Sequence, residues 1–183
     1  MRRIGLVALV TIALLASAAV VSAGNGKAVP GWHGASDHYT AISVTNPNNA
    51  AEVSDTLIRE STPDAVVTQH IKTLNACDWK GLMAQFPDTY ELRLPGGTVV
   101  TGRTEAAATF AGFVKPHADG GLCGITFTEL SRQVTGGTIA LTWEANSPFL
   151  AVPYRGSDAY ITDDGLMVSM VSTFDGAALQ FKP

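Results

Sequence analysis

The chain has 183 residues, of which 46% are hydrophobic and 15% charged, so it has room for one ordinary domain and not for a large multidomain enzyme. Its 16 acidic residues outnumber its 12 basic ones and give a formal net charge of -4. Proteins that bind a nucleic-acid backbone usually carry a basic surface, so we expect no nucleic-acid partner. The mean hydropathy of +0.17 is high for so few charges, and much of it comes from the first residues.

The first 23 residues have the pattern of a secretory signal peptide. Arg2 and Arg3 precede an apolar run over 4–21, and small residues follow at the expected cleavage position. We therefore predict a signal peptide over 1–23, export to the periplasm or secretion, and no stable membrane insertion after cleavage. The alternative is a retained anchor, because about 18 apolar residues can just span a bilayer.

Residues 24–61 are rich in glycine, asparagine, alanine, serine and threonine and show no sustained apolar period, which indicates an extended, flexible arm. The rest of the chain, 62–183, is predicted to be the folded domain. In an oxidising compartment Cys77 and Cys123 can form a disulfide, and the alternative is a pair of buried thiols. Neither cysteine has the spacing of a redox motif or a zinc site.

The domain is predicted to begin with helices. Thr62-Pro63-Asp64 is a helix start, and the helix is expected to continue to about Ala76. A second short helix follows Asp78, and a third is expected over 102–114. Each has an apolar stripe. The apolar residues of the three stripes are Val66, Val67, Ile71 and Leu74 in the first, Trp79, Leu82, Met83 and Phe86 in the second, and Phe110, Phe113 and Val114 in the third.

The second half of the sequence is predicted to consist of strands separated by glycine-rich and aspartate-rich turns. The expected strands are 90–94, 98–101, 124–134, 138–145, 154–162 and 166–174. Helices followed by a run of antiparallel strands are typical of an α+β fold.

The sequence lacks the glycine-rich, nucleophile-elbow and His-Glu-x-x-His motifs that hold nucleotides, serine nucleophiles or catalytic zinc, so we expect neither a cofactor nor a metal. What remains are ionisable groups on apolar faces. His70 lies on the apolar stripe of the first helix, where it could serve a cavity or simply be a core histidine. Asp158 and Tyr160 share one face of a strand, and the strand alone leaves open which face is the inner one.

These residues resemble a known superfamily. The segment 66–78, with Leu94-Pro95-Gly96-Gly97 and Gly102-Arg103 after it, is similar to the opening of the nuclear transport factor two-like superfamily, which includes SnoaL-like polyketide cyclases and ketosteroid isomerases. The segment 158–170 resembles its last hairpin. The resemblance covers about 62–175 and implies a cone of three N-terminal helices packed on a curved, mostly antiparallel sheet, with a pocket between them.

The resemblance also implies roles for three residues. His70 falls where ketosteroid isomerases have the tyrosine that donates to the substrate oxyanion, and Asp158 falls near their second oxyanion donor. Leu94 occupies the position of their general base. Leucine cannot take up a proton, so the usual isomerase chemistry lacks its base.

Two functions follow as hypotheses. The first is an exported small-molecule-binding protein without turnover, whose apolar pocket takes a small hydrophobic molecule and has His70 and Asp158 as its polar end. The alternative is an acid–base enzyme of the isomerase, cyclase or lyase type, acting on a small hydrophobic carbonyl compound through the same two residues. A homodimer through the open face of the sheet, which the resemblance implies, is compatible with both. The predicted pocket-lining residues are Trp79, Met83, Tyr90, Leu94, Phe110, Phe127 and Tyr160.

Overall fold

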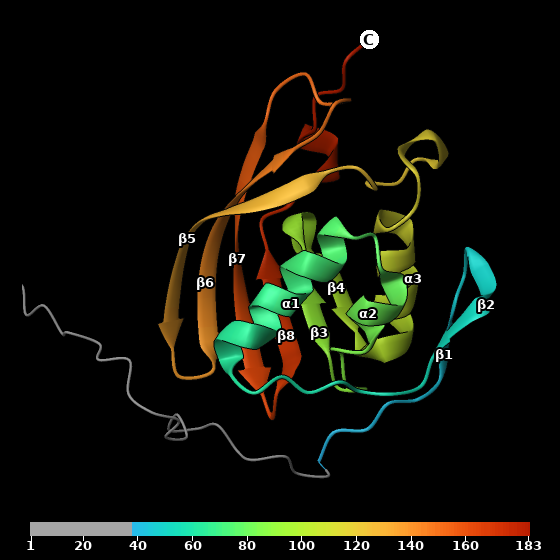
Figure 1. The fold of residues 1–183 in the computed structure, drawn as a ribbon, viewed down its shortest axis with the longest axis vertical. Coiled ribbons are helices and arrows are strands. Elements are labelled where there is room, and N and C mark those ends of the chain that lie inside the picture. Colours follow the sequence, from blue (N-terminus) through green and yellow to red (C-terminus); the bar gives the residue numbers. More distant parts are fainter. Residues whose placement is uncertain (1–37) are drawn as a thin grey trace, which may run out of the picture.

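The computed structural model describes residues 38–183, in which three helices pack against one face of a curved sheet (Figure 1). The helices are α1 Pro63–Asn75, α2 Trp79–Met83 and α3 Gly102–Phe113. The Thr62 hydroxyl accepts a hydrogen bond from the Ala65 amide and caps α1, and the Asp78 carboxylate accepts one from Gly81 and caps α2. The predicted signal peptide lies outside the described residues.

The sheet has six strands in the order β4-β3-β8-β7-β6-β5, and every neighbouring pair is antiparallel except β3 with β8. This arrangement confirms the predicted α+β class with a mostly antiparallel sheet. The strands are β3 Glu91–Arg93, β4 Val99–Thr101, β5 Thr126–Thr135, β6 Thr138–Asn146, β7 Tyr154–Asp163 and β8 Leu166–Ser172.

The inner face of the sheet is now defined. On β6 the buried side chains alternate and include Leu141 and Trp143, and on β7 they include Asp158 and Tyr160. Leu141 and Asp158 are direct partners across the two strands, so these side chains point to the same side. The question that the strand sequence left open is therefore settled: Asp158 faces the helices.

The N-terminal part of the described chain differs from the flexible arm predicted over 24–61. From residue 38 onward this segment contains a hairpin, β1 Val44–Asn46 and β2 Asn49–Ser54, that lies beside α3 (Figure 1). The physical reason is Arg103, which is 1% exposed in the first turn of α3. Its guanidinium donates to the Ile42 carbonyl at 3.0 Å and the Ser54 hydroxyl at 2.8 Å, and so fixes both sides of the hairpin.

Arg103 also donates to the carbonyl oxygens of Met83 and Phe86, just after α2. One buried cation thus joins three segments that are distant in sequence. Local composition cannot reveal such an anchor, because the polar hairpin has no apolar period of its own and the residue that holds it lies far along the chain.

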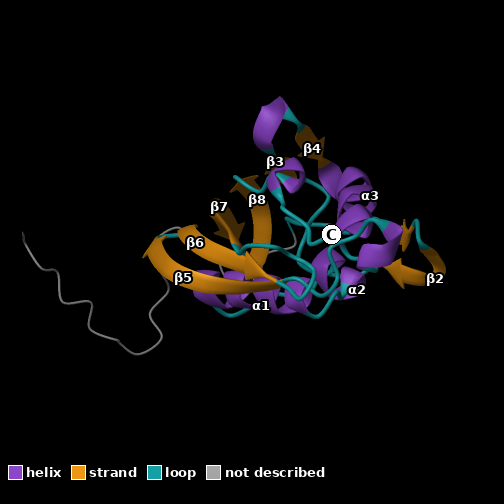
Figure 2. Cartoon of the chain, turned by 90° about the horizontal axis from the view of Figure 1, so that it is seen from above, coloured by secondary structure: helices purple, strands orange, loops and turns teal. Residues whose placement is uncertain are grey.

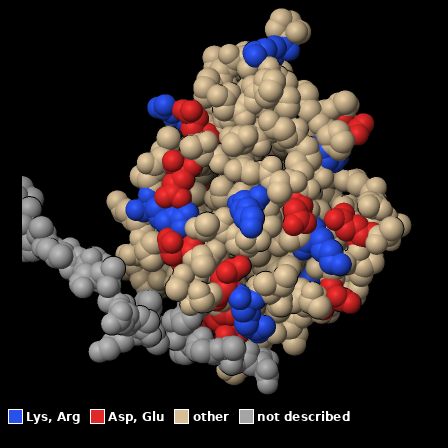
Figure 3. Space-filling view, in the orientation of Figure 1, with Lys and Arg blue, Asp and Glu red and all other residues tan. Residues whose placement is uncertain are grey.

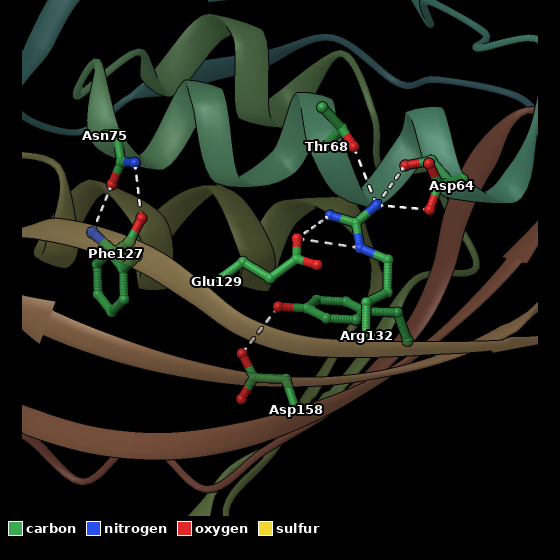
Figure 4. A network of polar contacts seen from close by, with 8 residues as sticks. Asp64, Thr68, Asn75, Phe127, Glu129, Arg132 and Asp158 are labelled. Atoms are coloured by element: carbon green, nitrogen blue, oxygen red, sulfur yellow. Dashed lines mark hydrogen bonds and ion pairs between the residues drawn. The ribbon is translucent and has the colours of Figure 1, made fainter.

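Helix α1 is fastened to β5 along its length (Figure 4). Near its start, the Arg132 guanidinium on β5 donates to the Asp64 carboxylate at 2.7 Å and the Thr68 hydroxyl at 3.0 Å. Near its end, the Asn75 side chain exchanges two hydrogen bonds with the backbone of Phe127, at 2.8 and 3.0 Å.

The two cysteines that the sequence left open form a disulfide, Cys77–Cys123, just beyond the end of α1. It joins the turn after that helix to the loop that leads into β5. No helix within residues 38–183 combines the length and apolar character needed to cross a membrane. The predicted homodimer stays a prediction.

Candidate functional site

A cavity of about 50 Å³ lies between α1, α3 and the inner face of the sheet. An empty cavity of about 150 Å³ is known to accept a benzene ring, so this one receives a group of only a few atoms without rearrangement. Its walls are mostly apolar, and the polar side chains that line it are His70, Asp158 and Ser172. Its aromatic wall consists of Phe110, Phe113, Phe127, Trp143 and Phe174.

The residues predicted to line a pocket fall into two groups. Five of the nine line the cavity, and the other four are buried in the core without lining it. The lining group is His70, Asp158, Leu94, Phe110 and Phe127, and the core group is Trp79, Met83, Tyr90 and Tyr160.

The core group packs elsewhere for specific reasons. The Trp79 indole donates to the Ala107 carbonyl at 2.9 Å and so joins α2 to α3. The Tyr90 ring stacks on Phe86 with ring centroids 4.1 Å apart. Sequence reasoning missed Phe113, Phe174 and Ser172 as lining residues. In the strand sequence Trp143 alternates onto the same side as Leu141, and that signal identifies Trp143 as a lining residue once the inner face is known.

His70 is completely buried, and neither ring nitrogen makes a hydrogen bond of normal geometry within residues 38–183, although the Gln85 amide is a polar neighbour. Its ring lies among aromatic neighbours, with centroid distances of 5.9 Å to Phe86, 6.1 Å to Phe110 and 5.7 Å to Tyr160. Burial lowers the pKa of His70 to about 4, against a smaller opposing effect of the Gln85 amide. The imidazole is therefore neutral at pH 7, with one donor and one acceptor nitrogen.

Asp158 is 8% exposed, and its two carboxylate oxygens differ in their contacts. Oδ2 accepts hydrogen bonds from the Trp143 indole and the Tyr160 hydroxyl, both at 2.8 Å. Oδ1 makes no hydrogen bond of normal geometry within residues 38–183, although the Ser172 hydroxyl and the Thr173 backbone also act on this carboxylate. Burial raises the pKa of the Asp158 carboxyl above its ordinary value, although the hydrogen bonds it accepts act in the opposite direction.

Tyr160 connects the two candidate residues. Its ring contacts the His70 ring, while its hydroxyl donates to Asp158 at 2.8 Å. The Trp143 indole donates to the same oxygen, and Gly156 leaves space for the indole: a Cβ at Gly156 would lie 2.4 Å from the Trp143 ring. The Asp158 carboxylate is therefore held in one orientation by two aromatic donors.

The low pKa of His70 predicts a pH-dependent stability. Its folded pKa of about 4 lies below the ordinary 6.5, so between these pH values the unfolded chain binds a proton that the folded chain does not. The stabilising effect of keeping His70 neutral is complete above pH 6.5 and is lost as the pH falls toward 4, by about 3 kcal/mol in all. Urea unfolding of wild type and His70→Leu across this range measures it.

In that comparison the wild type is expected to lose more free energy of unfolding than His70→Leu as the pH falls, whatever their difference at pH 7. Equal slopes for the two proteins would show that His70 is not buried in its neutral form.

No cluster of three or more histidine, cysteine, aspartate or glutamate side chains with metal-binding geometry occurs within residues 38–183. The polar groups at the cavity are one neutral imidazole, one carboxylate held by two donors, and the Ser172 side chain. This set suits hydrogen bonding to an organic molecule.

No family model matches the sequence, and no curated protein matches it significantly. Solved structures do match. A protein of unknown function from Burkholderia pseudomallei, described as NTF2-like, is 13% identical over 63% of this chain and 92% of its own, with a TM-score of 0.52. The chain has the nuclear transport factor two-like fold. This confirms the resemblance seen in the sequence.

Two further solved structures share this nuclear transport factor two-like fold. The epoxide hydrolase/cyclase-like enzyme SalBIII is 14% identical over 66% of this chain and 95% of its own, with a TM-score of 0.53. TerC, co-crystallized with polyporic acid, is 16% identical over 64% and 95%, with a TM-score of 0.52. At these identities the matches establish the fold, and function has to be argued from the site.

Proposed function

We propose that the protein binds a small, largely apolar molecule whose polar end enters the cavity and bonds to His70 and Asp158. The observation that carries this proposal is a set of buried polar atoms on one cavity: both nitrogens of His70 and Oδ1 of Asp158 make no hydrogen bond of normal geometry within residues 38–183, and both side chains line the same cavity. Gln85 acts on His70, and Ser172 and Thr173 act on Asp158, through weaker contacts. Buried polar atoms are almost always paired in folded proteins, so a bound molecule that pairs them accounts for their arrangement.

The chemistry of these atoms indicates the kind of polar end. A neutral imidazole offers one donor and one acceptor, and Asp158 offers an acceptor. A hydroxyl group both donates and accepts, so a single hydroxyl can serve the pair. The small cavity volume of about 50 Å³ supports a group of this size inside it, with the apolar body of the molecule toward the cavity mouth.

An acid–base enzyme acting through His70 and Asp158 has less support. A histidine whose pKa is about 4 is a weak base at pH 7, because its imidazole binds a proton only weakly. Leu94 lines the cavity at the position where the resemblance places the isomerase base, and it has no proton-accepting atom. Binding requires only a neutral His70 imidazole and a hydrogen-bond acceptor on Asp158, and burial favours the neutral form of His70.

We also propose where this binding takes place. The pattern of residues 1–23 supports export to the periplasm or secretion, and the Cys77–Cys123 disulfide is the kind of bond that persists in such oxidising compartments. TerC, which has the same fold, was co-crystallized with polyporic acid, which supports small-molecule binding as a use of this fold.

A matched pair of probes tests the proposal by titration calorimetry. Para-propylphenol and propylbenzene differ only in the hydroxyl. We expect the wild type to bind the phenol more tightly, and His70→Leu to lose about five- to tenfold of the phenol affinity, the worth of one or two net hydrogen bonds, while propylbenzene is little affected. The control Phe110→Leu should weaken both probes equally, because it changes only an apolar wall.

Two results would contradict the proposal: no binding of either probe, or an unchanged preference for the phenol in His70→Leu. A native mass spectrum of the protein from its own host would then identify the natural ligand by its mass.

A further inference from the structure

The cavity continues into a wider groove at one end of the molecule. The groove has a volume of about 700 Å³ and shares four lining residues with the cavity: Leu94, Phe113, Leu122 and Phe174. Figure 2, seen from above, shows loops and the C-terminus over this end, surrounded by helices and strands. A molecule whose polar end reaches His70 would therefore pass between the shared apolar side chains and lie in the groove.

One wall of the groove carries an uncompensated cation. Lys115 is partly buried, lines the groove, and has no ion pair within residues 38–183. The turn that follows it is tight: a Cβ at Gly121 would lie 2.0 Å from the Lys115 carbonyl oxygen and 2.3 Å from its Cγ. Because only glycine permits this approach, the Gly121 backbone packs directly on the carbonyl and stem of Lys115, and both residues line the groove.

The neighbouring wall is built from stacked rings. The His117 ring lies nearly parallel to Phe149, with centroids 4.0 Å apart, and stacks on Phe181 at 5.0 Å. The C-terminal segment that carries Phe181 is fixed by backbone hydrogen bonds from Ala151 to Gln180 at 2.8 Å and from Lys182 to Phe149 at 2.9 Å. The groove is therefore a formed feature of the fold with defined walls.

The acidic residue lining the groove is Asp175. Its Oδ1 accepts a hydrogen bond from the Ala177 amide at 2.9 Å, which fixes the side chain but leaves its negative charge. Neither Lys115 nor Asp175 has an ion pair within residues 38–183, so Lys115 is the groove's attractive charge for an anion and Asp175 its repulsive one. Figure 3 shows that acidic and basic side chains are interspersed on the face it presents, without a large patch of one sign.

We propose that the groove binds a carboxylate on the ligand, and that the ligand is an elongated hydroxy carboxylic acid of the phenolic-acid type. Its hydroxyl lies at His70 and Asp158, its ring lies between the apolar residues shared by cavity and groove, and its carboxylate pairs with Lys115. This inference rests on the proposed function and adds the second polar end. The charge pair is close enough to solvent to be weakened by salt.

The test adds a carboxylate to the phenol probe. Para-hydroxyphenylpropionate and para-propylphenol share the ring and hydroxyl and differ in the acid group. We expect the acid to bind wild type about fivefold more tightly at low salt, as a partly exposed ion pair allows, and expect Lys115→Gln to abolish that advantage without changing para-propylphenol affinity. Asp175→Asn should strengthen binding of the acid, and the exposed control Lys80→Gln should change neither probe.

The outcomes separate the two proposals. If both phenols fail to bind, the proposed function is overturned together with this inference. If para-propylphenol binds and the acid shows no advantage, or keeps its advantage in Lys115→Gln, only the groove assignment is overturned. The same assay should include hydroxyphenyl alkanoates with longer and shorter carbon chains, in case the carboxylate of the first probe does not reach Lys115. At least one acid of this series is expected to lose affinity in Lys115→Gln.

Discussion

Replacing Arg103 by alanine is expected to lower the free energy of unfolding by about 4 kcal/mol, because it leaves several buried oxygens without a donor at a cost of about 1–3 kcal/mol each, partly relieved by local rearrangement. The acceptors include the Ile42 and Phe86 carbonyls and the Ser54 hydroxyl, which lie on both sides of the side chain. No carboxylate hydrogen-bonds to this guanidinium in the described chain, so the cation itself is stabilised by backbone oxygens.

Urea unfolding followed by circular dichroism measures the effect. Arg103→Lys keeps the charge but offers one ammonium group in place of a branched guanidinium, so it should recover only part of the loss. The control Arg93→Ala removes an exposed arginine whose ion pair with Glu91 lies at the surface, and it should cost less than about 1 kcal/mol. If Arg103→Ala is as mild as the control, the buried anchor does not hold the hairpin.

Removing the disulfide is expected to cost up to about 4 kcal/mol, as the loop-closure entropy of a bond spanning 46 residues predicts. The double variant Cys77→Ala/Cys123→Ala tests this by urea unfolding. Removing both cysteines leaves no free thiol, so the comparison measures the cross-link and the two small side chains together.

A reductant supplies the matched control. Wild type treated with dithiothreitol should unfold at the urea concentration found for the double variant, and the double variant should not respond to dithiothreitol. A wild type that keeps its stability after full reduction would show that the cross-link contributes little, because Arg132 and Asn75 already hold α1 to β5.

The helices and strands were predictable because their signals are local. Thr62 and Asp78 cap helices through bonds to amides three residues away, and glycine-rich turns separate the long strands. The polar end of the cavity followed from the resemblance, which placed both His70 and Asp158. Local patterns could not decide which face of β7 is inner, because alternation is equally regular on both faces.

The remaining features depend on contacts between distant parts of the chain. The apolar stripe of α2 indicates that Trp79 and Met83 are buried. Their place in the core, away from the cavity, is decided by the packing of α2 against α3, which the sequence does not show. The hairpin near the N-terminus depends on Arg103 in the same way. The groove is built from two loops, the end of α3 and the C-terminal segment, whose sequences show no common pattern.

The position of Trp143 gives the cavity an optical signal. Its indole lines the cavity, donates to Asp158 at 2.8 Å and packs against Gly156. The fluorescence emission of Trp143 therefore depends on the charge of that carboxylate and on what occupies the cavity. The chain has 3 tryptophans; of the other two, Trp79 is buried in the core without lining the cavity, and Trp32 lies outside the described residues. In a variant with phenylalanine at positions 32 and 79, the fluorescence of Trp143 would report ligand binding in the cavity without an added dye.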